Sequence, residues 1–269
     1  MLINQKNMLN QKIKLFLLAT ILNIFTFQNI YAVRPFITDD ATVIGKNRHE
    51  LATWTFINNE HYEFWHSYSA GITNKIEIFV ALCYGIHNLE NENKKQFTYA
   101  APLLQTKFIL NEYEPNSYPG LIIAAGSDLP FGKGLFVPKG YGGFIFASAT
   151  QCLGNEEEVL IHAQIGENYL RLDKENLFGF NWGIGTQIKL YSGLHGVAEL
   201  VAGDPYINNA GSAYQLGFRH FVNDNIQFDL AFGKGFGGDN RLPFWISGGI
   251  RLVFDKSGGG FSSNGRKIE

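Results

Sequence analysis

Long segments in which large apolar residues alternate with small or polar ones limit the folds open to this chain. The clearest segment runs from Phe178 to Leu190. Successive side chains of a β-strand point to opposite faces, so this strand has one apolar face and one small or polar face. It exceeds the roughly 5–6 residues of a typical soluble strand and reaches the roughly 9–11 that cross a bilayer. Its large residues all share one phase: Phe178, Phe180, Trp182, Ile184, Ile188 and Leu190.

The same alternation recurs and predicts about twelve strands, an even number as bacterial single-chain barrels require. Short connections alternate with longer ones, which is the arrangement of periplasmic turns and extracellular loops. The sequence therefore predicts an all-β fold, a single antiparallel transmembrane β-barrel. A soluble secreted β-sandwich is the alternative that periodicity alone leaves open. We place the strands at 48–57, 62–72, 76–86, 97–110, 119–127, 142–152, 158–168, 177–191, 196–203, 212–222, 226–234 and 243–254.

The two ends of the chain differ from this repeating part. Three lysines precede an apolar stretch at residues 15–27, and a small residue, Ala32, follows it. This order predicts a signal peptide at 1–32, cleaved after Ala32, because the stretch is shorter than the roughly 20 residues of a spanning helix. We assign 33–254 to the barrel and the Gly- and Ser-rich 255–269 to a polar, disordered tail.

Composition supports β structure and argues against nucleic-acid binding. The chain is 14% aromatic and contains 30 glycines, and no later apolar stretch approaches the length of a spanning helix. A barrel is the β structure that can span a bilayer. The net charge of −2 gives no basic face for nucleic acid. Cys83 and Cys152 are too few for a disulfide scaffold, and whether they pair stays open.

Two stretches resemble a known family. Arg34-Pro35-Phe36 followed by Thr38-Asp39-Asp40, within Val33–Glu50, leads into a Trp-bearing strand, and Pro243–Phe254 forms the last strand. They resemble the mature start and the closing strand of the outer-membrane proteins called MetA-pathway of phenol degradation. The likeness is concentrated at these ends. It implies an outer-membrane barrel of a Gram-negative bacterium that passes small solutes, hydrophobic or aromatic ones included.

Five charged residues on successive predicted strands occupy the phase opposite the large apolar residues: Lys189, Glu199, Arg219, Asp229 and Arg251. An Arg or Lys facing lipid at mid-membrane costs about 2–4 kcal/mol, so we expect them to line the lumen. Their mixed signs suggest interior ion pairs. These pairs would fill and rigidify the barrel, or line a solute path and set its charge selectivity.

Other motifs carry less chemistry. Gly233, Gly235 and Gly238 match the dinucleotide fingerprint in letters, but no βαβ unit surrounds them. We interpret Asp39-Asp40 as solvated acids, or as a turn or cap, because an isolated pair seldom supplies the oxygens that calcium takes. No G-x-S-x-G motif occurs. We therefore expect no enzyme, no cofactor and no metal.

The preferred function is passage of small solutes through a polar-lined lumen, with lipid, the solute and the outer-membrane assembly machinery as partners. The loop from Ser127 to Tyr141 is unusually apolar. It could fold into the lumen as a constriction or pack at the rim. A structural or adhesion barrel with a plugged lumen, and a lipid-modifying enzyme of the outer membrane, are the alternatives.

Overall fold

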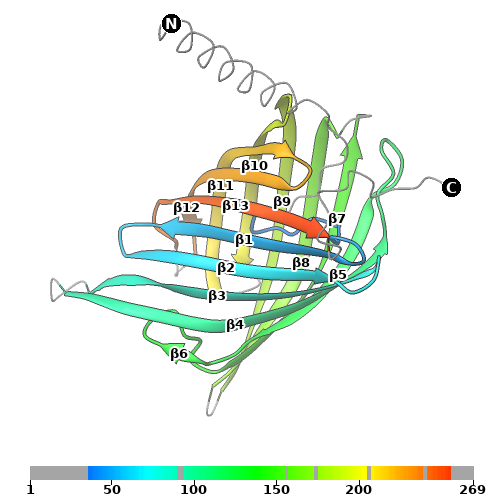
Figure 1. Ribbon diagram of the computed structural model, residues 1–269. Helices are drawn as coiled ribbons and strands as arrows, with labels where there is room; N and C mark the ends of the chain where they lie inside the picture. Colours follow the sequence, from blue (N-terminus) through cyan, green and yellow to red (C-terminus); the bar gives the residue numbers. More distant parts are fainter. Residues whose placement is uncertain are drawn as a thin grey trace, which may run out of the picture.

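The computed structural model describes residues 36–89, 94–154, 157–172, 175–204, 207–238 and 241–255. Twelve long antiparallel strands form a closed barrel (Figure 1). A further strand of two residues, β6, pairs with β4. No helix in these ranges is both long and apolar enough to cross a membrane. The strands are β1 Arg48–Ile57, β2 His61–Gly71, β3 Ile76–Leu89, β4 Lys94–Asn111, β5 Gly120–Asp128, β6 Gly132–Lys133, β7 Tyr141–Leu153, β8 Val159–Arg171, β9 Asn176–Tyr191, β10 Leu194–Asp204, β11 Ile207–Asn223, β12 Ile226–Gly237 and β13 Trp245–Asp255.

The first and last strands close the sheet. β1 pairs with β13 from Arg48 opposite Asp255 to Ile57 opposite Ile246. The other long strands pair with their neighbours in sequence. β5 pairs directly with β7, because β6, which lies between them in the sequence, pairs with β4 instead. Each of the twelve long strands is therefore paired on both sides. An unpaired strand edge would be costly in the hydrocarbon of a bilayer. The predicted fold class is confirmed. The predicted signal peptide at 1–32, and the tail beyond Asp255, lie outside the described residues.

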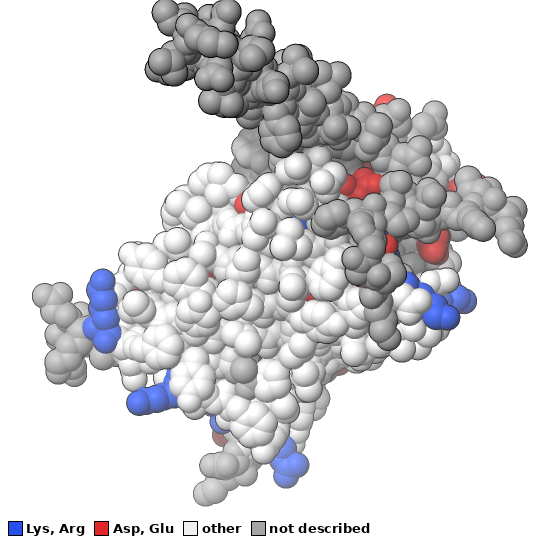
Figure 2. Space-filling model, viewed as in Figure 1, with Lys and Arg blue, Asp and Glu red and all other residues white. Residues whose placement is uncertain are grey.

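The outer surface of the barrel is apolar. On β9, Phe178, Phe180 and Ile184 are exposed to the outside, while Gly183 and Gln187 on the alternate phase are buried. Figure 2 shows the middle of the visible face almost entirely white, with the Lys and Arg side chains gathered near its edges. A lipid bilayer can cover such a belt of large apolar side chains. The alternation therefore points the large residues outward, as expected from the sequence.

Several strands run farther than the alternation indicated. β3 reaches Leu89 and β4 begins at Lys94, so the connection between them is shorter than the predicted 87–96 loop. The apolar loop between β5 and β7 contains β6, which pairs with Tyr99 and Ala100 of β4. Farther along the same loop, the Phe136 ring meets the lumen-facing His61 ring edge-on, with centroids 5.7 Å apart. The loop thus packs at the rim and also turns one aromatic ring inward.

Candidate functional site

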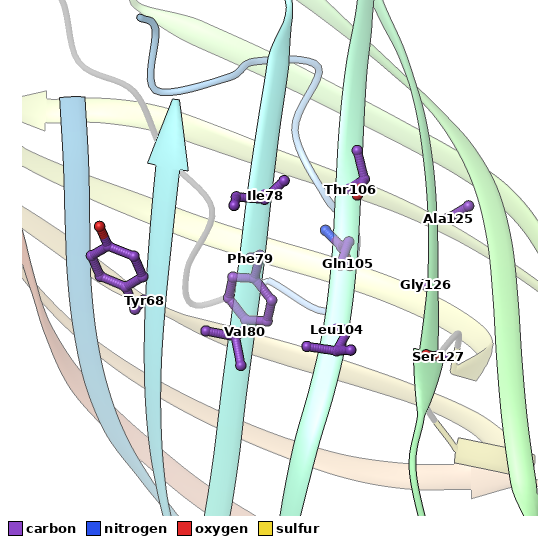
Figure 3. A pocket seen from close by; sticks show the side chains of 10 residues that line it. All are labelled: Tyr68, Ile78, Phe79, Val80, Leu104, Gln105, Thr106, Ala125, Gly126 and Ser127. Atoms are coloured by element: carbon purple, nitrogen blue, oxygen red, sulfur yellow. The ribbon is translucent and has the colours of Figure 1, made fainter. Parts of the chain in front are cut away.

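An irregular stretch of chain lies inside the barrel. We call residues 36–46 the lumenal segment; it leads into the turn before β1. Its side chains are buried without a break from Thr38 to Ile44. In Figure 3 the pale blue coil passes behind β3 and β4. Its partners Glu77 and Thr150 lie beside the short connections that flank β3 and β7. The segment therefore occupies the end of the barrel that the sequence predicts to be periplasmic.

Side chains of the wall, rather than another strand, bind the backbone of the lumenal segment. Glu199 on β10 accepts hydrogen bonds from the backbone N–H groups of Ile37 (3.0 Å) and Thr38 (2.5 Å). Buried N–H groups need such partners, and these come from four strands in all. The others are Asp39 N–H to Gln164 Oε1 (2.8 Å), Ala41 N–H to Thr150 Oγ1 (2.8 Å) and Ile44 N–H to Glu77 Oε2 (2.9 Å).

The strongest side-chain contact of the segment is an ion pair. Lys107 Nζ on β4 lies 2.6 Å from Asp39 Oδ1, and both side chains are almost fully buried. Asp40 Oδ1 accepts a hydrogen bond from the Thr42 hydroxyl at 2.7 Å. Burial raises the pKa of Asp40 to about 6, although the charge of Lys107 opposes this shift. Our interpretation of Asp39-Asp40 as solvated acids is wrong, because both side chains are buried, Asp39 against Lys107 of the wall and Asp40 against Thr42 of the segment itself.

Apolar and aromatic contacts complete the packing of the segment. Ala41 and Val43 belong to a cluster with inward-facing residues of β4, β5 and β7: Ile109, Ile122, Ala124, Phe144 and Phe146. The Phe36 ring lies with its centroid 5.2 Å from that of His162 and 5.4 Å from the Arg219 guanidinium carbon. These contacts are of the kind found in a protein core, so the segment fills its part of the lumen.

One glycine of the barrel wall allows the lumenal segment to pack closely against β9. A Cβ atom at Gly183 on β9 would stand 2.2 Å from Thr38 Oγ1. Real Cβ atoms do not approach other heavy atoms so closely, so a larger residue at 183 would force the Thr38 side chain to change its position. The small phase of β9, seen in the sequence as alternate glycines, is thus the face that receives the lumenal segment.

The five charged residues predicted from the sequence occupy different surroundings. Glu199 binds the lumenal segment, and Arg219 donates from Nη1 to Gln187 Oε1. Arg251 Nε lies 2.7 Å from Glu50 Oε2, an ion pair across the β1–β13 seam. Asp229 is buried, and Lys189 is half-buried near the short turn after β9. Arg251 therefore pairs with Glu50, a residue outside the predicted set.

Sequence reasoning missed most residues that hold the lumenal segment, namely Glu77, Lys107, Thr150 and Gln164. Each lies on the small or polar phase of a predicted strand, but nothing in the alternation marks it above its neighbours. The resemblance to a family did mark residues 33–50 as unusual. It gave no position for them relative to the barrel.

The remaining candidate groups are metal ligands, a buried histidine and the two cysteines. In the described ranges no group of three or more His, Cys, Asp or Glu residues is arranged to hold a metal ion. His162 lies in the lumen, where its Nδ1 is 2.9 Å from Thr150 Oγ1. Cys83 and Cys152 are buried and are not joined to each other.

A groove of about 320 Å³ crosses the outside of β3, β4 and β5, as the close view in Figure 3 shows. Outward-facing Ile78, Val80 and Leu104 line it, together with Thr106 and Ala125. No charged residue lines it. It faces the apolar surroundings of the barrel, so we place no polar solute there.

Comparison with known proteins places the fold among outer-membrane barrels. No family model and no curated protein matches the sequence. The COG4313 outer membrane channel from Pseudomonas putida F1 matches with a TM-score of 0.58 and 10% identity, over 83% of this chain and 100% of that one. The KdgM porin (TM-score 0.54, 7% identity, 76% and 99%) and the NanC porin (0.51, 8%, 77% and 99%) are also similar. At such low identity the likeness concerns the fold.

Proposed function

We propose that this protein is an outer-membrane channel for small solutes, and that the lumenal segment closes it in the state described. The observation that carries the proposal is the set of polar contacts that hold residues 36–46 across the lumen. Each contact is a single hydrogen bond or ion pair that water can replace. A segment held by such contacts and by apolar packing, and not by strand pairing, can leave the lumen without breaking the sheet.

The cellular setting of the proposal comes from several features. The apolar belt suits a bilayer, and the similar solved structures include outer-membrane channels and porins. We propose cleavage of a signal peptide after Ala32, so that the lumenal segment begins close to the mature N-terminus. The resemblance to the MetA-pathway of phenol degradation family favours hydrophobic or aromatic solutes. We propose no covalent chemistry and no resident cofactor.

The proposal is tested with the purified mature chain in planar lipid bilayers. We expect discrete current steps that appear and disappear, because each step reports the segment leaving or entering the lumen. Heat-treated, unfolded protein is the control for leaks in the bilayer. A folded barrel that gives no steps at any applied voltage would contradict the proposal and favour a structural barrel with a permanent plug.

A further inference from the structure

The wall formed by β12, β13, β1 and β2 makes none of the side-chain hydrogen bonds to the lumenal segment described above, although Ile37 packs in the cluster that contains Trp245 of β13. The segment's hydrogen bonds described above go to β3, β4, β7, β8 and β10. The other wall presents two tryptophans to the lumen. Trp54 on β1 and Trp65 on β2 lie directly opposite each other, with ring centroids 5.6 Å apart and planes within 2°. Both side chains are half-exposed.

Carboxylates flank this tryptophan pair on both sides. Trp65 Nε1 donates to Glu63 Oε2 at 2.6 Å, and the other oxygen of Glu63 lies 2.9 Å from His61 Nε2. On the opposite side, Trp54 faces Gly249 of β13 across the strand pair. Asp229 of β12 faces the same glycine.

Gly249 lets Trp54 and Asp229 pack closely from either side of β13. A Cβ atom at position 249 would stand 3.0 Å from Trp54 Cβ and 3.2 Å from Asp229 Oδ2. The Cβ atom of Trp54 and the carboxylate of Asp229 therefore lie against the same glycine, one from each neighbouring strand. Any side chain larger than hydrogen at position 249 would crowd both of them.

Asp229 is a buried carboxylate without a partner in the described part of the chain. Its relative exposure is 8%, and neither carboxylate oxygen accepts a hydrogen bond there. Arg219 is its register partner on β11, but its guanidinium extends toward Gln187 and Phe36 instead. A buried carboxylate left without donors is costly, so this arrangement suits a ligand that brings positive charge.

We propose that this wall binds organic cations, namely ammonium groups that carry aryl or alkyl substituents. Trp is the best aromatic partner for such cations, and a desolvated cation–π contact is stronger than an exposed one. Asp229 and Glu63 supply the counter-charge, and the Trp54–Trp65 pair supplies the ring surface. The inference rests on the proposed channel function, because a solute must enter the lumen to reach this wall. It narrows the solute class from aromatic compounds in general to cationic ones.

Calorimetric titration of the detergent-folded protein with phenyltrimethylammonium tests the proposal. We expect saturable binding that benzenesulfonate, the anionic counterpart, does not show. Asp229→Asn and Trp54→Leu should each weaken binding about tenfold or more, from the lost charge and the lost ring respectively. Gly249→Ala crowds Trp54 and Asp229 and should weaken binding while keeping both groups. Glu167→Gln on the outer face of β8 removes a charge elsewhere and should leave binding unchanged.

Equal binding of the sulfonate, or equal affinity in Asp229→Asn, Trp54→Leu and wild type, would overturn the cation site. If Asp229→Asn does not fold, the affinity of Gly249→Ala decides instead, and an affinity equal to wild type overturns the cation site. The assay needs no conductance, so the two proposals can fail separately. Current steps without phenyltrimethylammonium binding would reject only the cation site. Binding without current steps would reject the channel.

Discussion

Deleting residues 36–44 is expected to raise the single-channel conductance severalfold, more than any single substitution in the wall. The deletion removes the buried stretch and its polar contacts, and leaves Gly45 to connect the preceding residues to β1. Lys107, Glu199 and Glu77 would then face a water-filled lumen, where their charges are solvated. The barrel should remain closed, because the pairing of β1 with β13 does not involve the segment. Planar-bilayer recordings measure the change.

The control for this deletion is the folded state of the barrel. Unheated samples on a gel should migrate as compact barrels in both proteins, and the steps of the deleted form should be longer-lived as well as larger. A compact barrel with unchanged step size would show that the lumenal segment does not limit the current.

A charge on the lipid-facing side of β9 is expected to prevent assembly of most of the protein. Ile184 is 48% exposed on the outer face near the middle of the strand. An Arg at the bilayer midplane costs about 2–4 kcal/mol, a large share of the roughly 5–15 kcal/mol that typically stabilises a folded protein. Ile184→Arg should therefore greatly reduce the heat-modifiable, membrane-inserted fraction in refolding into lipid vesicles.

The matched control is Leu190→Arg, on the same face and the same strand but one residue from its end. Near the interface the same substitution costs only about 0–1 kcal/mol, so this variant should assemble almost as well as wild type. An equal loss of the assembled fraction in both variants would argue against a bilayer whose midplane lies near Ile184. Equal survival of both would argue against lipid contact on this face.

Most of the barrel could be predicted from the sequence, because one physical rule governs every strand. Lipid outside and a filled lumen inside force alternation, and β9 follows it from Phe178 to Leu190. The strand ends were less well predicted. Beyond the bilayer both faces can be polar, so β3 continues to Leu89 without the signal that marks its middle. β6 is two residues long and carries no periodicity at all.

The candidate site was harder to predict than the fold, because its contacts join residues far apart in the sequence. Asp39 and Lys107 are 68 residues apart, and Glu50 and Arg251 are 201 apart. Alternation assigns a face to each residue but not the direction in which a long side chain extends. Arg219 and Asp229 illustrate this limit: they are register partners, as their positions suggested, yet Arg219 reaches toward the lumenal segment and Asp229 toward Gly249.

The most direct test of the central claim is a disulfide that locks the lumenal segment in place. A Cβ atom at Gly183 would stand 3.4 Å from Thr38 Cβ, close to the roughly 3.5–4.5 Å of a disulfide. Thr38→Cys and Gly183→Cys, combined with Cys83→Ala and Cys152→Ala, leave only the new pair. In planar bilayers the account predicts no current steps from the oxidised protein and their return after reduction. Identical steps before and after reduction, with the disulfide verified by mass spectrometry, would contradict it.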